Sequence, residues 1–516
     1  MRFLFAPARL SGALRVRLAL GAEYGLVVAA ALAYAATLAC HGASPALEDH
    51  VEPGVGAIAS ALASGSPPYH GLTGEASYEL PYGPAVFAVH ALAFAIFGRS
   101  LVVLKASGLV ACGLAAWLCF TVFRRRASPR CASGGLLLLL VYLAYYDARA
   151  FWCRPEPFLL LGSAAGLWIV RTRDKGSTLG LALVVAWMLD LKVTGPIYLL
   201  PILAIAAARR GWREAASAAL FGVVLALGVF VIPPLSLGAY LELLVRTAHH
   251  GLSAPELALN VSAAALLLGP ALAVRAFRVR GPPRPPQRAA WLVPTGWLIA
   301  SAAIVCVVAA KPGAGRHHLI PLLPLALDAF IDGVDGIERD RVSLRASRIL
   351  TLVERVAACA LVLALSLASV RTVRARAERA RRASAELASV LLEHRSDDVG
   401  MGYGGAASYD DTFARLLVAI ATPARLDAAS QMDSTAAGFP ASVMLGKAVA
   451  RCLPRVWILP SGDPFSMESF YGGAPVFDAA FRREFAGRYE LVETRAIFRV
   501  YRCRGAAAPE PPDGPL

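Results

Sequence analysis

Charged residues are scarce in this chain. Of its 516 residues only 17% are Asp, Glu, Lys or Arg, whereas 57% are hydrophobic and the mean hydropathy is +0.56. A water-soluble globule of this length is incompatible with such a balance. The composition therefore excludes a soluble globular protein and indicates a polytopic membrane protein.

Several familiar motifs are also missing. The nine cysteines show no CxxC spacing, which argues against a zinc cluster. The glycine-rich stretch 401–405 lacks GKS/T and a full dinucleotide fingerprint, so it predicts an ordinary glycine turn. No internal repeat is visible. The net charge of +15 lies in short basic clusters between apolar runs, which membrane topology explains better than nucleic-acid binding.

The apolar runs predict a bundle of membrane-spanning helices. A hydrocarbon core of about 30 Å needs roughly 20 apolar residues as a helix, and fewer where a segment is buried in protein. About eleven spans satisfy this condition, near residues 17–39, 101–123, 132–147, 158–170, 177–191, 195–208, 215–235, 259–274, 290–310, 319–331 and 349–370. The shorter stretch from Pro84 to Phe97 begins with proline and stops at Gly98, so it predicts an interfacial or re-entrant helix.

The basic clusters set the predicted orientation. With the stretch from Pro84 to Phe97 left out of the count, the clusters near residues 124–126, 171–175, 209–213, 275–288 and 339–348 share the side of the basic N-terminus. The positive-inside rule makes that side cytoplasmic. The first helix is longer than a signal-peptide core and predicts a retained anchor. We expect a multi-pass protein of a bacterial inner membrane, with a cytoplasmic N-terminus and an extracytoplasmic C-terminus.

A second domain follows the membrane part. Hydropathy drops after about residue 372, so we expect a transmembrane domain over 1–372, an extracytoplasmic soluble α/β domain over 373–505 and a disordered tail over 506–516. Strands are predicted at 456–459 and 496–502. Cys452 and Cys503 both lie in this domain, in a compartment predicted to be oxidising, and we expect them to form a disulfide.

An acidic pair, Glu48-Asp49, opens the first predicted extracytoplasmic loop (40–100). Glu52, Glu75 and Glu79 follow it, while Lys and Arg are absent between residues 18 and 98. An ordinary protein surface mixes both signs of charge. This loop therefore predicts a functional site.

The order of features in the membrane part resembles the GT-C membrane glycosyltransferases, which include the protein O-mannosyltransferases and the lipid A aminoarabinose transferase. One helix leads to the acidic pair within 47–53, followed by the amphipathic stretch 58–65, by Pro68-Tyr69, and by Tyr82-Gly83-Pro84 at the start of the interfacial helix. Similar elements stand at Arg154-Pro155-Glu156-Pro157, at 191–194, and at Arg316-His317-His318 before 321–324. Many members carry Asp first in the acidic pair, so the order Glu48-Asp49 leaves open which carboxylate is catalytic.

The resemblance implies an enzyme that transfers a sugar from a polyprenyl-phosphate donor. An acceptor hydroxyl or amine that attacks the anomeric carbon needs a carboxylate to take its proton, and Asp49 is the first candidate for this base, with Glu48 second. The phosphate leaves without a proton, so cations should stabilise it. Arg154, Lys192 and Arg316 are the candidates; alternatively, the two arginines snorkel to lipid headgroups.

Four further residues are predicted to bind substrate: Glu52, Tyr82, His317 and His318. Tyr82 could instead belong to an aromatic belt at the membrane interface, together with Tyr69 and Tyr78. Some GT-C enzymes bind a metal, and a divalent ion could be held by the histidine pairs 249–250 and 317–318 with His50 and Glu52. No cofactor follows from the sequence alone.

Two other classes stay open at this stage. A transporter or flippase would also place ionisable residues in its spans, although near the midplane and often in repeated halves. A non-catalytic scaffold for envelope assembly could keep the same fold. The enzyme interpretation expects as partners a lipid-linked sugar donor and an acceptor that is lipid, glycan or protein.

Overall fold

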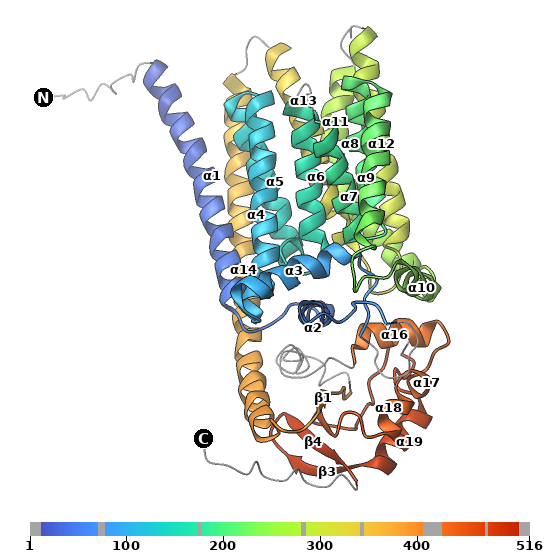
Figure 1. Ribbon diagram of the computed structural model, residues 1–516. Coiled ribbons are helices and arrows are strands. Elements are labelled where there is room, and N and C mark those ends of the chain that lie inside the picture. The colour runs from blue at the N-terminus through green and yellow to red at the C-terminus, as the bar shows by residue number, and fades with distance from the viewer. Residues whose placement is uncertain are drawn as a thin grey trace, which may run out of the picture.

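The computed structural model of the chain describes residues 12–70, 78–172, 177–279, 285–340, 345–405, 426–469 and 473–504. It consists of a helix bundle and a smaller α/β domain below one end of that bundle (Figure 1). The predicted tail 506–516 lies outside the described residues.

Every predicted span falls on helices of the bundle. These are α1 (Gly12–Ala43), α4 (Leu101–Arg126), α5 (Pro129–Tyr146), α6 (Pro155–Thr172), α7 (Thr178–Leu191), α8 (Gly195–Arg210), α9 (Trp212–Val229), α11 (Ala254–Val279), α12 (Pro285–Val308), α13 (Leu323–Asp340) and α14 (Arg345–Glu393). Among the described residues, six helices are long and apolar enough to cross a membrane by length and composition. The predicted mainly helical, multi-pass membrane fold is confirmed.

Local sequence signals set the ends of these helices. The Ser100 hydroxyl accepts the backbone N–H of Val103 at the start of α4, and Ser128 accepts that of Cys131 at the start of α5. Each such N-cap typically stabilises a helix by about 1 kcal/mol. Gly98 has a φ of 83°, which allows the sharp turn from the preceding helix, α3 (Pro84–Phe97), into α4.

Three helices lie across the end of the bundle that faces the C-terminal domain. They are α2 (Val51–Ala63), α3 (Pro84–Phe97) and α10 (Leu237–Thr247) (Figure 1). The α3 side chains Leu92, Ile96 and Phe97 are between 62% and 74% exposed. An apolar helix that crosses the bundle end and exposes such side chains fits the predicted interfacial helix.

The opposite end of the bundle gathers basic side chains from the predicted cytoplasmic clusters. The guanidinium groups of Arg126 and Arg171 both pair with Asp328, at 2.5 and 2.6 Å, and Arg126 also pairs with Asp332 at 3.0 Å. The predicted extracytoplasmic loops meet at the other end, which therefore holds a separate set of charges.

Helix α14 connects the two parts of the molecule. It runs without interruption from the bundle into the C-terminal domain, through residue 372 (Figure 1). The predicted span 349–370 is thus the first part of one helix of 49 residues. Near its end, Leu387 and Val390 are buried in the core of the C-terminal domain.

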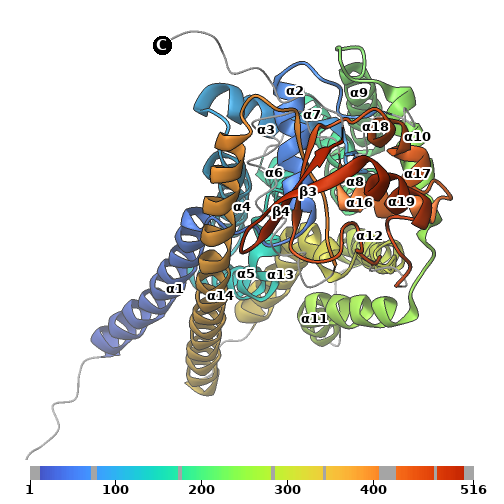
Figure 2. The ribbon, with the colours of Figure 1, turned by 90° about the horizontal axis from the view of Figure 1, so that it is seen from below.

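The C-terminal domain is built on a four-stranded sheet with the order β1-β2-β4-β3. Its strands β3 and β4 lie side by side in Figure 2. β1 (Val399–Met401) pairs in parallel with β2 (Val456–Pro460), while β4 (Phe498–Cys503) pairs antiparallel with β2 and with β3 (Tyr489–Thr494). The predicted strands at 456–459 and 496–502 correspond to β2 and β4. The helices of the domain are α16 (Ala428–Ala436), α17 (Ala441–Met444), α18 (Gly446–Ala450) and α19 (Ala479–Arg488).

Alternation along β2 gives the sheet two apolar faces. Val456 and Ile458 pack with the end of α14, whereas Trp457 and Leu459 belong to an aromatic-rich core on the other face. Gly402, from the glycine-rich stretch, follows β1 where an added Cβ would come within 2.8 Å of the Phe465 ring. Close packing therefore accounts for this glycine, and the predicted glycine turn is wrong, since residues 402–405 continue from β1 without forming a turn.

Cys452 and Cys503 form the predicted disulfide, which joins residues 51 positions apart. Closing a loop of this length typically contributes about 2–4 kcal/mol, mainly by restricting the unfolded chain.

We expect Cys452→Ala to lower the unfolding midpoint of the C-terminal domain in detergent, and reductant to slow the wild-type protein in gel electrophoresis. Cys40→Ala, which removes a free and partly exposed cysteine, serves as the control and should leave both readouts unchanged. Equal midpoints for wild type and Cys452→Ala would contradict the prediction.

Candidate functional site

The loop after α1 carries the acidic pair, and a buried lysine fixes its backbone. The Lys105 ammonium, fully buried in α4, donates to the carbonyl oxygens of His41, Ser44 and Ala46. These carbonyls belong to the last turn of α1 and to the residues after it. The chain is therefore held at the point where it turns toward Asp49.

Asp49 pairs with an arginine from a distant segment. Its Oδ2 lies 3.0 Å from Nη1 of Arg154, and its Oδ1 accepts the backbone N–H of Val51 at 2.7 Å. About one fifth of the Asp49 side chain stays exposed. Burial would raise the pKa of the Asp49 carboxyl, but Arg154, His50 and the Val51 N–H outweigh it and hold this pKa below its ordinary value.

The segment that presents Arg154 follows the short helix η1 (Asp147–Ala150). The Arg154 guanidinium lies over the Trp152 ring, 4.1 Å from its centroid, and a ring nitrogen of His90 contacts the Cys153 carbonyl oxygen at 2.8 Å. Gly108 of α4 passes so close that an added Cβ would lie 2.1 Å from the Trp152 carbonyl oxygen. A larger residue at 108 would push this segment away.

A second buried ion pair lies beside the first. The Lys192 ammonium is 3.0 Å from Oε1 of Glu156 and 3.4 Å from Nδ1 of His318, and it lies 5.4 Å from the centroid of the Tyr82 ring. Nε of Arg154 is 4.0 Å from Oε2 of Glu156. Glu156 therefore lies between the two cations and joins them into one network.

Tyr82 is positioned by the residue that follows it. Gly83 donates its N–H to the Leu191 carbonyl at 3.0 Å, and an added Cβ would lie 2.1 Å from the carbonyl oxygen of Asp190. Only glycine allows this approach. The Tyr82-Gly83-Pro84 turn thus packs directly against the end of α7 that carries Lys192.

These side chains surround a cavity of about 430 Å³ at the junction of the bundle and the C-terminal domain. Arg154, Lys192, His318 and Tyr82 line it from the bundle side. Lys311 adds a further cation, and α16 contributes Ala429 and Asp433 from the C-terminal domain. The Lys311 ammonium donates to the Thr247 carbonyl at 3.0 Å and lies 3.8 Å from Asp433. Among the lining residues of this cavity, positive groups predominate.

Glu48 points to a different partner from its neighbour Asp49. Its carboxylate pairs with Arg376 of α14 and lies 3.3 Å from the His41 ring. Neither Glu48 nor Asp49 is among the residues that line the cavity, but Asp49 is bonded to Arg154, which does line it. The two members of the acidic pair thus have separate surroundings, one beside a cavity residue and one beside α14.

The remaining predicted site residues also fall into two groups, those at or beside the cavity and those away from it. His318 lines the cavity, and the His317 ring packs against Trp152 with 5.1 Å between centroids. Arg316 is directed elsewhere, because its guanidinium contacts the Tyr145 hydroxyl at 2.9 Å near the protein surface. Glu52 is fully buried below the loop and does not line the cavity.

One group of side chains in the described residues has the arrangement of a metal-binding set. The potential ligand atoms of Glu156, His317 and His318 all lie within 4.8 Å of one another. The Lys192 ammonium already contacts two of them and supplies the compensating charge, so a metal ion would have to displace it. The set expected from the sequence is not assembled, since Glu52 bonds elsewhere and a ring nitrogen of His249 contacts the Arg246 carbonyl oxygen.

Comparison with known proteins gives a structural match only. No protein-family model matches the chain, and no curated protein sequence matches it. The crystal structure of ArnT from Cupriavidus metallidurans bound to undecaprenyl phosphate aligns with a TM-score of 0.59 over 95% of this chain and 99% of that one, at 13% identity. The apo structure aligns with a TM-score of 0.53 over 93% and 98%, at 14% identity. This chain has the ArnT fold.

The ArnT fold accounts for both parts of the molecule, because the alignment covers nearly all of each chain. The resemblance to the GT-C group inferred from the sequence is thereby confirmed for the fold. At 13% identity the match assigns no role to any residue, so the roles of the cavity residues stay predictions.

Three residues of the site escaped the sequence-based selection. Glu156 stands in the Arg154-Pro155-Glu156-Pro157 motif, where a carboxylate in the first turn is also typical of an ordinary helix start. Lys311 and Asp433 line the cavity from segments far apart in the chain. Lys311 could have been found, since it is the one lysine in the predicted extracytoplasmic loop 311–318.

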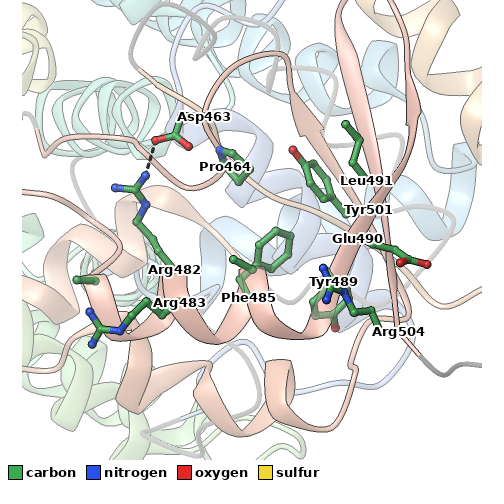
Figure 3. A pocket seen from close by; sticks show the side chains of 12 residues that line it. Asp463, Pro464, Arg482, Arg483, Phe485, Tyr489, Glu490, Leu491, Tyr501 and Arg504 are labelled. Carbon is green, nitrogen blue, oxygen red and sulfur yellow. Dashed lines mark hydrogen bonds and ion pairs between the residues drawn. The ribbon is translucent and has the colours of Figure 1, made fainter.

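A second hollow, of about 500 Å³, lies between α19 and β3 on the C-terminal domain. Figure 3 shows Arg482 reaching Asp463 at one end, with Phe485 and Tyr501 in the middle. None of the site residues predicted from the sequence lines this hollow.

We expect Lys192→Met to destabilise the protein by about 3–5 kcal/mol, because it leaves the Glu156 carboxylate buried without its ammonium partner. The double variant Lys192→Met/Glu156→Gln should recover more than half of this loss. The measurement is reversible unfolding in mild detergent.

The control breaks an exposed pair instead. Arg482→Met removes the partner of Asp463, and the two side chains are 38% and 67% exposed, so the change should cost only about 0–1 kcal/mol. Equal losses for Lys192→Met and Arg482→Met would contradict the prediction.

Proposed function

We propose that the protein is a membrane glycosyltransferase that moves a sugar from a polyprenyl-phosphate donor to an acceptor hydroxyl or amine at the extracytoplasmic face. One observation carries this proposal: Asp49, which can accept a proton, pairs with Arg154, and Arg154 is one of three cations that line the cavity. The ArnT fold supports it, since one solved structure with this fold contains undecaprenyl phosphate.

The reaction is a single displacement with inversion at the anomeric carbon. The acceptor oxygen or nitrogen attacks that carbon, and its bond to the sugar forms as the bond to the phosphate oxygen breaks. The acceptor proton passes to the Asp49 carboxylate, and the electron pair leaves with polyprenyl phosphate. General-base assistance of this kind typically contributes about 10²- to 10⁴-fold in rate.

The cavity cations fit a phosphate leaving group. Arg154, Lys192 and Lys311 line one space, and preorganised positive charge stabilises the oxyanion that develops on the phosphate. Arg154 lines the cavity, and its guanidinium has five N–H donors, one of which, at Nη1, binds Asp49. The guanidinium can therefore also bind an incoming anion. Arg316 does not take part in this arrangement.

The surroundings of the two acidic residues favour Asp49 over Glu48 as the base. Asp49 is partly exposed beside Arg154, whereas only 7% of the Glu48 side chain is exposed and the Arg376 guanidinium holds its carboxylate. We propose that Glu48 anchors the loop to α14.

The position of the cavity suits a lipid-linked donor. It lies where the bundle meets the C-terminal domain, at the end crossed by α3 with its exposed apolar side chains. A headgroup in the cavity would leave its polyprenyl chain at the membrane surface, and a polar acceptor could approach from the aqueous side. The positive-inside pattern supports an extracytoplasmic position for this end, in a bacterial inner membrane.

A transporter is less well supported by the arrangement of charges. Transporters place their ionisable groups at the bilayer midplane within broken helices. Here Asp49, Arg154, Lys192 and Lys311 gather at one end of the bundle.

We expect Asp49→Asn to lower sugar transfer by about 10²- to 10⁴-fold, because asparagine keeps the shape of the side chain and cannot take a proton. Mass spectrometry of envelope glycolipids and glycoproteins, with and without the protein, identifies the product. The rate is then measured with purified protein and that acceptor.

Asp332→Asn is the matched control for this experiment. It makes the same change in an Asp–Arg pair of the same 3.0 Å length, at the opposite end of the bundle. Transfer should stay within about twofold of wild type. A folded Asp49→Asn protein with undiminished transfer would refute the proposed role of Asp49.

The dependence of the rate on pH should reflect the lowered pKa of Asp49. A carboxylate whose pKa lies below its ordinary value stays ionised as the pH falls, so its function is lost only at a lower pH. The pKa of the neighbouring His50 is lowered too, in this case by burial, so its imidazole also stays neutral to a lower pH than usual. We expect kcat/KM, which reports the ionisation of the free enzyme, to stay nearly constant from about pH 7.5 to about pH 5. A fall in kcat/KM centred near pH 6.5 would contradict this prediction.

A further inference from the structure

We infer that Glu52 is a positioning residue that fastens the Asp49 loop to the Arg154 segment. The inference rests on the proposed function and gives Glu52 a role other than direct substrate binding. It is carried by the contacts of the two carboxylate oxygens, which bind segments about 100 residues apart in the chain.

Each oxygen of Glu52 binds one of the two segments. Oε2 accepts the backbone N–H groups of Glu48 and Asp49, at 2.6 and 3.2 Å. Oε1 accepts the backbone N–H of Cys153 at 3.2 Å and its Sγ–H at 3.4 Å. The bound peptide groups belong to Asp49 itself and to the residue just before Arg154. A single carboxylate thus fixes both sides of the Asp49–Arg154 pair.

Burial separates Glu52 from any ligand. The residue is 0% exposed, and it is absent from the residues that line the cavity. A substrate in the cavity cannot reach its oxygens, which are already occupied by backbone donors. Glu52 therefore acts through the residues that it holds.

The charge of Glu52 is compensated locally. Besides its backbone donors, the Lys105 ammonium is close enough to interact with its carboxylate. Lys105 in turn binds three carbonyl oxygens of the same loop. Two buried side chains of opposite charge thus satisfy five backbone groups between residues 41 and 49: two N–H groups through Glu52 and three C=O groups through Lys105. Buried backbone groups of this kind need such partners.

Glutamine at position 52 would test this arrangement with little change in shape. Its amide has one acceptor oxygen, and its NH₂ group cannot accept a hydrogen bond. Either the N–H groups of Glu48 and Asp49 or the N–H of Cys153 would then face a donor. We call the two sets of hydrogen bonds from Glu52, to residues 48–49 and to Cys153, the Glu52 clamp. In the glutamine variant one of the two sets must break.

Amide hydrogen exchange of the full-length protein in detergent tests whether these hydrogen bonds protect residues 48–49 and 153. It needs no activity measurement. In Glu52→Gln we expect amide exchange about tenfold faster in peptides that contain residues 48–49 or 153, since a net hydrogen bond is worth about one factor of ten. Glu23→Gln is the matched control, because Glu23 is also buried and binds Arg355 far from the loop. Unchanged exchange in both peptides would overturn the inference.

Kinetics then separate positioning from substrate binding. We expect Glu52→Gln to lower kcat by about 10- to 100-fold with KM within about threefold, because a small displacement of reacting groups is costly. In the Asp49→Asn background the same substitution should lower the rate by less than about threefold. Glu52→Asp, which is too short to span both segments, should not restore kcat.

The two proposals fail in different ways. Two results together would show that Glu52 binds substrate: a raised KM, and an equal fold-loss of rate from Glu52→Gln in the wild-type and Asp49→Asn proteins. They would overturn the inference, while the transferase function would stand. If the wild-type protein transfers no sugar, the proposed function fails, and the exchange experiment still decides whether the clamp exists.

Discussion

The buried charges at one end of the bundle constrain the rest of the structure. A buried ion without a partner costs several kcal/mol, so each must find an opposite charge or a set of hydrogen bonds. Here Asp49, Arg154, Glu156 and Lys192 satisfy one another across the first loop, α6 and the end of α7. These ion pairs join segments that lie far apart in the sequence. Close approaches at Gly83 and Gly108 are needed because these segments must come within ion-pair distance.

The sequence predicted the helices well because hydropathy acts locally. Each span matched a helix, and the short stretch from Pro84 to Phe97 has the bounds of α3. Asp49, Arg154 and Lys192 were also identified, since charges beside apolar runs stand out. Sequence could not tell that Arg316 turns to Tyr145, because the direction of a loop side chain depends on tertiary contacts. It could not place Asp433 in the cavity either, because that contact joins two domains.

The C-terminal domain is part of the site as well as an addition to the bundle. α14 reaches it without a break, and Arg376 of that helix holds Glu48, next to Asp49. α16 contributes Ala429 and Asp433 to the cavity wall, and Asp433 lies 3.8 Å from the Lys311 ammonium. A rigid helix on one side and a wall residue on the other fix how the domain sits over the cavity.

The Asp49–Arg154 pair imposes opposite demands on the proposed base. Arg154 keeps Asp49 ionised and ready to accept a proton, but the same positive charge makes the carboxylate a weaker base. On the proposed function, a donor phosphate changes this balance, because it brings negative charge to the guanidinium. As the phosphate engages Arg154, the cation is shared and its hold on Asp49 weakens. The carboxylate then becomes more basic when the donor is bound, which is when the acceptor proton must leave.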